Sequence, residues 1–192
     1  MWEFFLVYTM DELIDILTKD GHPTGKTALK SEIHRKGYFH NTAHLWLYTN
    51  NKKILLAQRS LKKTIFPGLW DVSVAGHVDA GETVEQAIIR ECQEEIGLTL
   101  NPSELTKIGV FPCFQKYDFG IEDNEFHHTF IAELKVPLTQ LNPDANEVED
   151  LQLVTFDDFI NLLNNSQNTN YFVDSNRSYY ETVMQNIMQL SS

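Results

Sequence analysis

The sequence predicts an α+β fold in which helices and a mixed sheet form layers, as in an α/β/α sandwich. Short apolar or alternating runs indicate strands, apolar residues at helical spacing indicate one central and two late helices, and the two kinds of segment are interleaved along the chain. With 192 residues and 42% hydrophobic composition, the chain can bury roughly two thirds of its unfolded surface. A full-sized core is therefore expected.

The first predicted strands surround a turn. Residues 43–48 and 54–59 are apolar and flank residues 49–52 (TNNK), which is the pattern of a hairpin. Residues 71–75 alternate polar and apolar side chains, so they predict a third strand that runs directly into Gly76. The segment that follows this glycine then begins at the end of a strand.

The central helix has clear boundaries in the sequence. Thr83 and Gln86 form a capping-box pattern, apolar residues follow at helical spacing, and Gly97 supplies a stop. Further strands are expected at 108–114, 125–134 and 151–155, and helices near 157–163 and 179–190. Because asparagine and glutamine gather at 161–170, that stretch is expected to be a surface loop.

Composition and charge limit the classes of function. The first residues lack the basic region and cleavage site of a signal peptide, and apolar runs stay short, so a cytoplasmic protein without a membrane span is expected. The net charge of −12 would repel polymeric nucleic acid and an anionic membrane. Cys92 and Cys113 suggest neither a disulfide framework nor a zinc-ligand spacing. A small ligand is the expected partner, and a homodimer is the default oligomer.

Carboxylates crowd the predicted central helix. Glu91, Glu94 and Glu95 lie three and four positions apart and share one helix face, and Glu82 precedes them in the loop. Each like-charged pair is unfavourable by about 0.2–0.5 kcal/mol even in water, and a divalent cation would offset this repulsion. Carboxylate oxygens are preferred ligands of Mg²⁺ and Mn²⁺, and Mg²⁺ is commonly shared with substrate phosphates. A solvated acidic helix face is the alternative.

Two neighbouring residues fit the metal-site hypothesis. Arg90 lies four residues before Glu94 and can orient a glutamate, while the Gly76 carbonyl can approach a metal closely because no side chain shields it. Together with the glutamates, these residues indicate phosphate chemistry with Mg²⁺ or Mn²⁺ as the cofactor.

The spacing of these residues resembles the Nudix box. Gly76 is followed after five residues by Glu82 and after seven more by residues 90–98 (RECQEEIGL). Every fixed residue of the box is present, and Cys92 stands where a larger aliphatic residue is usual. The resemblance implies a Nudix-type α/β/α sandwich with a catalytic loop-helix-loop, which acts as a pyrophosphohydrolase on a diphosphate linked to another moiety.

The resemblance also implies residue roles. Glu94 and Glu95 would bind metal, and Glu91 would bind metal or act as a general base. The Gly76 carbonyl would be a further ligand, while Arg90 and Glu82 would orient the helix and the loop. On this reading residues 1–192 form one Nudix domain, with 1–40 as an N-terminal extension, 41–160 as the core and 161–192 as a C-terminal helical segment.

Segments outside the box resemble the isopentenyl-diphosphate isomerase-like branch of Nudix proteins. These segments are residues 34–40 (HRKGYFH), 66–70 (FPGLW), 75–77 (AGH) and 123–125 (DNE). In isomerases of this type a catalytic cysteine precedes the Gly-His pair, and here that position is Ala75. Those isomerases also have a degraded box, whereas this chain keeps all three box glutamates. Hydrolysis of a small nucleoside-diphosphate-type or other organic diphosphate is therefore favoured over isomerisation, and a non-catalytic nucleotide sensor is a third alternative.

The branch resemblance implies a second set of candidate residues. The metal ligands of the isomerases map to His40, His77, Asp123 and Glu125, with His34 displaced by a different spacing. His40, His77 and Glu125, together with Trp70, are the candidate substrate contacts.

Other residues have two interpretations each. Trp70, Phe66 and Tyr117 can stack on a base or pack on a prenyl chain, but aromatic residues beside strands commonly belong to the core. His44 and the pair His127-His128 lie in predicted strands, where packing or surface exposure is favoured over catalysis. Glu147 and Glu149 precede a strand, in a region from which some Nudix enzymes recruit a catalytic carboxylate.

Overall fold

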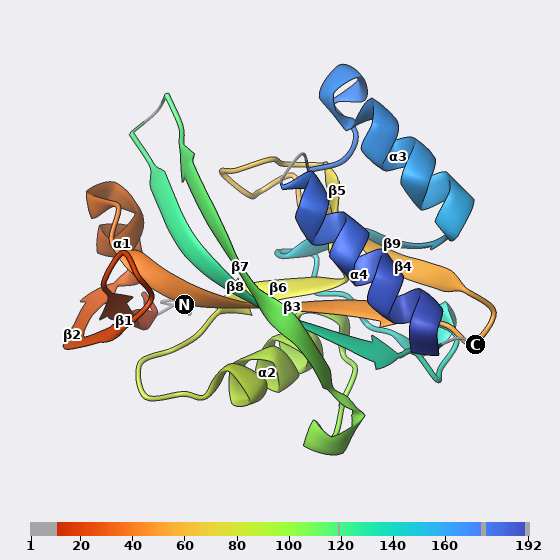
Figure 1. Cartoon of the computed structure of the whole chain (residues 1–192), viewed down its shortest axis with the longest axis horizontal. Coiled ribbons are helices and arrows are strands. Elements are labelled where there is room, and N and C mark those ends of the chain that lie inside the picture. Colours follow the sequence, from red (N-terminus) through yellow and green to blue (C-terminus); the bar gives the residue numbers. More distant parts are fainter. Residues whose placement is uncertain (1–10, 119, 174–175, 191–192) are drawn as a thin grey trace, which may run out of the picture.

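Strand β3 (Phe39–Tyr48) organises the first half of a mixed sheet in the computed structural model, which describes residues 11–118, 120–173 and 176–190 (Figure 1). It pairs in parallel with β8 (Glu122–Glu133) and antiparallel with β6 (Val74–His77). The long strand β7 (Thr106–Lys116) pairs antiparallel with β8. The mixed sheet predicted from the sequence is confirmed.

A second group of strands starts from the turn after β3. Strand β4 (Lys53–Arg59) pairs antiparallel with β9 (Val148–Thr155) along its length and with the short β5 (Trp70–Asp71) near its end. The register between β3 and β4 contains one pair, Tyr48 with Ile54, beside the turn. The predicted hairpin is therefore present, but its two strands diverge after the turn.

The N-terminal part of the described chain forms a hairpin and a short helix. Strands β1 (Leu13–Leu17) and β2 (Pro23–Leu29) pair antiparallel, and α1 (Lys30–Lys36) follows them. Leu17 pairs with Phe39, which joins the hairpin to the start of β3. The sequence predicted no element in this segment, and residues 1–10 of the expected N-terminal extension lie outside the described residues.

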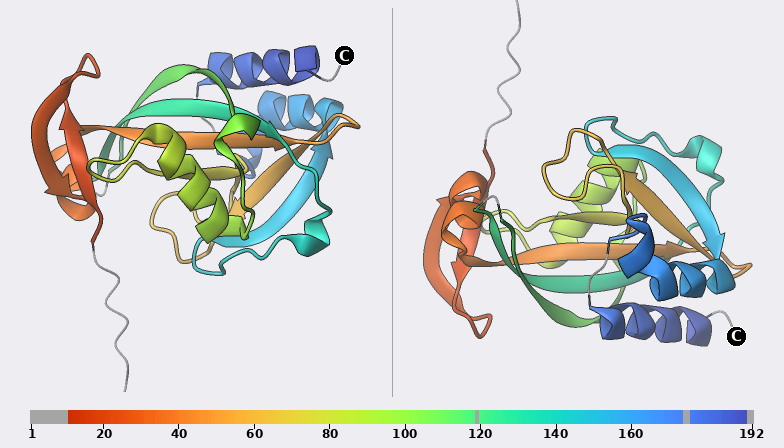
Figure 2. Two further views of the ribbon diagram at one scale, coloured as in Figure 1. Left: turned by 90° about the horizontal axis from the view of Figure 1, so that it is seen from below. Right: turned by 90° about the horizontal axis from the view of Figure 1, so that it is seen from above.

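Helices lie on both sides of the sheet (Figure 2). Helix α2 (Val84–Ile96) lies on one side, and α3 (Phe156–Thr169) and α4 (Arg177–Leu190) lie on the other. Short 3₁₀ turns occur at Pro102–Glu104 and Leu138–Gln140. No helix in the described part of the chain is long and apolar enough to cross a membrane. The predicted layered sandwich is confirmed.

Alternation along β3 divides the core into two clusters. Leu45 and Leu47 are buried with residues of α2, whereas Trp46 is buried with Phe159 of α3 and Tyr180 of α4. Successive side chains of a strand point to opposite faces. The apolar run at the centre of β3 therefore supplies both cores.

The sequence predicted a surface loop at 161–170, and this prediction is wrong because α3 continues to Thr169. Phe159, Leu163 and Ser166 are buried and recur at helical spacing along one face. Burial of this face outweighs the modest helix propensity of the asparagines, which lie mainly on the exposed side.

The sequence also predicted one strand at 71–75, where the structure has the two short strands β5 and β6. Between them the Ser73 hydroxyl donates to the Leu55 carbonyl at 2.6 Å and accepts from the Leu47 backbone N–H at 2.8 Å. Ser73 thus bridges β3 and β4 where they diverge, and the chain crosses from one to the other. As a result Gly76 and His77 lie within β6 and not after it.

Helix α2 begins and ends as the sequence predicted. Thr83 and Gln86 form both hydrogen bonds of the capping box, and Gly97 ends the helix in the left-handed conformation with φ of 70°. Ile88 and Cys92 are buried beneath the sheet. The opposite side of the helix is left to its polar and charged residues.

Candidate active site

One cavity of about 680 Å³ brings most of the predicted site residues together. The three α2 glutamates line it, and His34, His77 and Glu125 line it from α1, β6 and β8. Its volume lies in the range of small-molecule sites. The two sets of residues that the sequence singled out, those of the box and those outside it, therefore share one cavity.

Polar residues alternate along two paired strands beside this cavity. The register places His40 opposite Glu125 and Thr42 opposite His127, and His44 is the next residue of β3 on the same face. Further along β3 this face carries Trp46, which belongs to the core under α3 and α4. One sheet face is therefore apolar where helices cover it and polar where it meets the cavity.

The carboxylates of α2 reach the sheet at β6. A Cβ atom added to Gly76 would lie 2.0 Å from Cδ of Glu91, so only glycine leaves room for this carboxylate. Glu95 is buried, and its Oε2 accepts a hydrogen bond from the Ala75 backbone N–H at 3.4 Å. Glu94 is more exposed than either. The three carboxylates thus lie along one edge of the cavity.

Arg90 connects the loop, the helix and the strand. Its guanidinium donates to both oxygens of Glu82 at 3.1 and 3.0 Å, to Glu91 Oε1 at 2.7 Å and to Glu94 Oε2 at 3.1 Å. It also donates to the His77 carbonyl at 3.0 Å. A planar guanidinium can hold several acceptors in fixed directions. These contacts would allow Arg90 to orient the loop and the helix glutamates, which is the role that the resemblance implies for it.

Burial shifts the acid–base behaviour of the α2 glutamates. It raises the pKa of Glu91 to about 7, against the opposing effect of Arg90. Burial, with the neighbouring charge of Glu91, also raises the pKa of Glu95 well above its usual range. Buried carboxylates side by side are unfavourable unless a cation accompanies them. This all-oxygen donor set fits Mg²⁺ or Mn²⁺.

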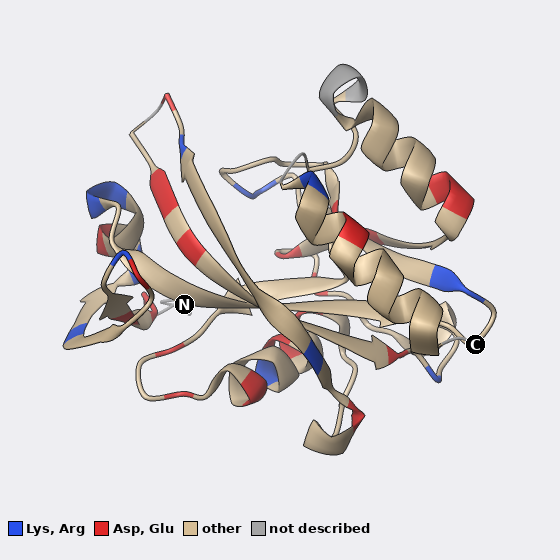
Figure 3. Ribbon diagram, in the orientation of Figure 1, with Lys and Arg blue, Asp and Glu red and all other residues tan. Residues whose placement is uncertain are grey.

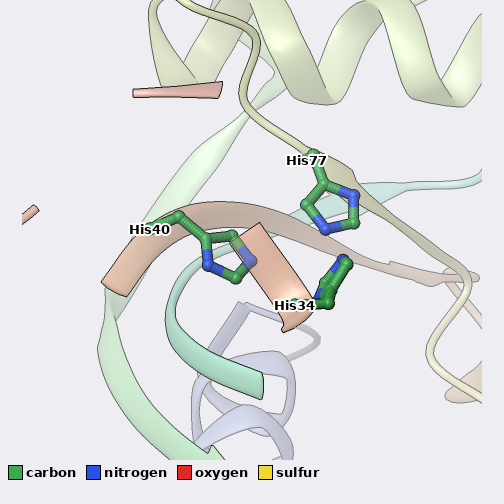
Figure 4. Close-up of side chains that lie close together, drawn as sticks. All are labelled: His34, His40 and His77. Atoms are coloured by element: carbon green, nitrogen blue, oxygen red, sulfur yellow. The ribbon is translucent and has the colours of Figure 1, made fainter. Parts of the chain in front are cut away.

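Three histidines form a second group of candidate ligands. His34 of α1, His40 of β3 and His77 of β6 point toward one another (Figure 4), with ring centroids 5.2 to 5.4 Å apart. Their ligand atoms lie within 4.8 Å of one another. The Nε2 atoms of His40 and His77 are buried without a hydrogen-bond partner. Unpartnered buried nitrogens that face a common point are the arrangement expected of metal ligands.

An oxygen lies beside Nδ1 of each of these three rings. The oxygens are Asp123 Oδ1 at 2.5 Å from His34, the Tyr38 carbonyl at 3.0 Å from His40, and Glu12 Oε2 at 3.6 Å from His77. Such outer partners commonly fix the ring of a metal-ligating histidine so that the other nitrogen faces the metal. Asp123 therefore contacts the outer side of the group, whereas Glu125 Oε1 lies 3.5 Å from His40 Nε2. Three imidazoles and one carboxylate fit a divalent transition metal.

The surroundings of His77 and His40 shift the pKa values of these two side chains in opposite directions. Burial and the charge of Lys30 hold the pKa of His77 well below its usual range. Burial lowers the pKa of His40, but the Glu125 carboxylate beside it outweighs this, so its pKa is raised. His77 is thus neutral near pH 7, which is the form that binds a metal.

Cations that line the described part of the cavity are already paired. Acidic residues gather on α2 and at the start of β8 (Figure 3). The four lining lysine and arginine side chains and their partners are Lys30 with Glu12, Arg59 with Asp71, Lys63 with Glu147, and Arg90 with Glu82. An anionic phosphate entering this cavity would need additional positive charge, which divalent cations supply.

The remaining predicted residues are divided between the core and the cavity. Trp70 is buried in the core and does not line the cavity. Phe66 and Tyr117 line it and face each other with centroids 5.8 Å apart. Glu147 lines the cavity from the turn before β9, whereas Glu149 is exposed on β9 away from it.

Two histidines that the sequence assigned to packing or exposure line the cavity. His44 and His127 stack with centroids 4.0 Å apart. His128 points to the other face of β8 and is hydrogen-bonded to Asn41 at 2.9 Å. Polar residues at every second position of 40–44 and 123–127 were the signal that could have placed both histidines beside the predicted site.

The chain is similar to several known proteins. The NUDIX domain model matches residues 38–175. Nudix hydrolase 3 of Arabidopsis thaliana is 33% identical over 174 residues, which are 88% of this chain but 22% of that protein, so the chain spans about a fifth of its length. An isopentenyl-diphosphate Delta-isomerase of Cutibacterium acnes is 31% identical over 159 residues, covering 79% of this chain and 78% of that one. The crystal structure of DR0079 from Deinococcus radiodurans has a TM-score of 0.66 and 19% identity, covering 85% and 93% of the two chains.

Proposed function

The chain belongs to the Nudix superfamily, on its isopentenyl-diphosphate isomerase-like branch, and on that premise we propose that it is a divalent-metal-dependent pyrophosphohydrolase. Its substrate would be a small nucleoside-diphosphate-type or other organic diphosphate. The observation that carries the proposal is the set of three carboxylates, Glu91, Glu94 and Glu95, along one edge of a cavity of small-molecule size. Gly76 leaves the space that this arrangement requires.

The chain's own residues suit this reaction. Glu91, Glu94 and Glu95, with the Gly76 carbonyl, would hold Mg²⁺ or Mn²⁺. A bound cation supplies charge withdrawal from the phosphoryl oxygens and lowers the pKa of water. Where Glu91 acts as the general base and not as a ligand, its burial, which raises its pKa to about 7, lets it accept a proton from the attacking water near neutral pH. Arg90 keeps Glu91 and Glu94 in place while the proton moves.

A second divalent ion would be held by the histidine group. His34, His40 and His77 would contribute Nε2 atoms and Glu125 a carboxylate oxygen; His40, His77 and Glu125 are among the ligands implied by the branch resemblance, whereas Asp123 is not in this set. Asp123 would support His34 from outside. This site lies in the same cavity as the α2 carboxylates, so it would bring further positive charge to the bound diphosphate.

The proposal is tested by incubating the protein with Mg²⁺ or Mn²⁺ and a panel of diphosphates. The panel contains nucleoside diphosphates and triphosphates, nucleotide sugars, thiamine diphosphate and isopentenyl diphosphate, with products separated by mass. Metal-dependent cleavage of one class is expected, and Glu94→Gln should abolish it without loss of fold. Tight binding of a nucleotide without turnover under any divalent metal would support a sensor instead.

An isomerase is the second candidate, and two observations favour it. The Cutibacterium acnes relative carries that name, and the histidine group contains His40 and His77, two of the positions that the branch resemblance implies as isomerase ligands. Ala75 counts against it, because a methyl group can neither donate nor accept a proton. Exchange of solvent deuterium into isopentenyl diphosphate would establish isomerisation, and its absence would exclude it.

A further inference from the structure

The cavity wall contains another group of potential ligands, His44, Glu125 and His127, with ligand atoms within 4.8 Å of one another. The two imidazole rings stack with centroids 4.0 Å apart and planes at 24°. A ring nitrogen binds a metal in the plane of its ring, so two nearly parallel stacked rings direct their lone pairs side by side and not to one point. This geometry favours a supporting role for the pair over a metal site of its own.

His127 contacts the carboxylate of Glu125. Its Nε2 donates to Glu125 Oε2 at 2.8 Å, and both residues lie on the same face of β8. The other oxygen, Oε1, is the one that lies 3.5 Å from His40 Nε2. The hydrogen bond to His127 therefore fixes the rotation of the carboxylate that turns Oε1 toward the histidine group.

His127 is itself held from two sides. Its ring is hydrogen-bonded to the Cys113 side chain on β7 and stacked on the His44 ring. His44 Nδ1 is hydrogen-bonded to the Tyr179 hydroxyl at 3.0 Å. These contacts leave the His127 ring little freedom to turn away from Glu125.

Tyr179 anchors this arrangement to the C-terminal helix. It lies on α4, is buried, and its hydroxyl accepts from Trp46 Nε1–H at 2.7 Å. A continuous series of contacts thus runs from Tyr179 through His44 and His127 to Glu125. Side chains that orient a metal ligand from outside commonly contribute a factor of about 10–100 to metal affinity.

We propose that His127 is a positioning residue for Glu125 and that Tyr179, through His44, completes its support from α4. This inference rests on the proposed function in one respect, because it takes Glu125 as a ligand of the ion held by His34, His40 and His77. It assigns a role in metal binding to the C-terminal helix, which lies outside the residues of the box.

The inference is tested by titrating the metal-free protein with Co²⁺, whose visible absorption reports its ligands, in excess Mg²⁺ to occupy the α2 carboxylates. His127→Leu should weaken Co²⁺ binding about 10–100-fold and alter the spectrum. His127→Gln retains an N–H donor near the same position and should recover part of the affinity. His128→Leu, on the other face of the strand, is the matched control and should bind as the wild type does.

Tyr179→Phe provides a second variant that keeps the packed ring and removes the hydroxyl. In the wild-type background this change should weaken Co²⁺ binding several-fold. In the His127→Leu background it should weaken binding much less, because Tyr179 acts through His127. Wild-type affinity and spectrum in His127→Leu, or equal losses in His127→Leu and His127→Gln, would overturn the positioning role. Unchanged binding in Tyr179→Phe would overturn the support from α4.

The same titration separates this inference from the proposed metal centre. If the wild type binds no Co²⁺, or binds it no more tightly than His77→Ala does, the histidine group is not a metal site and the proposed second ion is wrong. If His77→Ala abolishes binding but His127→Leu leaves it intact, the metal centre stands and the positioning role alone fails. Circular dichroism of each variant checks that the fold is retained.

Discussion

Glu91 should make the stability of the metal-free protein fall as the pH rises toward 7. Its pKa in the folded protein is about 7, against a usual value of 4.5. A raised pKa means that the folded state binds the proton more tightly than the unfolded chain does. The stabilisation by protonated Glu91 is therefore complete below pH 4.5 and is lost as the pH rises through 7. The difference corresponds to about 3 kcal/mol at about 1.4 kcal/mol for each pH unit.

The measurement is thermal unfolding in a chelating buffer between pH 4.5 and 8, with Glu91→Gln as the reference. Glutamine keeps the shape of the side chain but does not titrate, so the pH dependence of groups that do not interact with Glu91 cancels in the difference. The wild type should lose about 3 kcal/mol relative to the variant across this range, which is about 6–12 °C in Tm for a chain of this size.

Metal should reverse the loss. At pH 8 the ionised carboxylates bind Mn²⁺, and the folded state gains free energy in proportion to the logarithm of the metal concentration above Kd. At pH 5 protons compete for the same oxygens, so the gain should be small. A flat difference between wild type and Glu91→Gln, or equal stabilisation by Mn²⁺ at both pH values, would refute the reasoning.

Three further predictions concern the site and the corrected helix. Glu95→Gln should reduce turnover at least about 100-fold, measured as product formation, while raising Tm in chelator at pH 8 because a buried charge is removed. Gly76→Ala should displace Glu91 and reduce turnover and Mn²⁺ affinity together, whereas Gly25→Ala, whose Cβ would meet nothing within 4 Å but whose φ of 71° strains an alanine, should lower Tm and leave turnover of the folded protein unchanged. Asn165→Pro should destabilise the fold by about 3 kcal/mol relative to Asn165→Ala in urea unfolding, and equal stabilities would mean that residue 165 is not inside a helix.

Local sequence patterns correctly predicted the elements whose ends depend on interactions between neighbouring residues. Helix α2 has its capping box at Thr83 and its stop at Gly97 because both depend on residues within four positions. The two incorrect predictions depend on distant contacts instead. Helix α3 persists through its asparagines because Leu163 is buried under the fold, and the strand at 71–75 is divided because Ser73 bridges β3 and β4.

The candidate active site likewise combines residues that local spacing brings together with residues that only tertiary contacts bring together. Glu91, Glu94 and Glu95 lie four positions apart at most, so helical spacing placed them together. His44 and His127 required the pairing of β3 with β8, which joins residues more than 80 positions apart. Glu12 and Tyr179 come from opposite ends of the chain and reach the site only through tertiary packing. No local pattern in the sequence connects either of them with the box.

Strand β6 carries residues for which the two candidate reactions have different requirements. The register pairs Gly76 with Ala43, whose side chain lies in the core beside α2, and pairs His77 with Thr42, which lines the cavity. Glycine thus admits the α2 carboxylate on one side, while His77 faces the histidine group on the other.

Residue 75 lies on the same face of β6 as His77, and it is the position at which the two reactions make different demands. Proton transfer at carbon needs an acid or base there, and the methyl group of Ala75 offers neither. The proposed hydrolysis would use the carboxylates to hold a cation and Arg90 to orient them, and these side chains are present with the contacts described. The chemistry available on the two faces of this strand therefore favours the hydrolase.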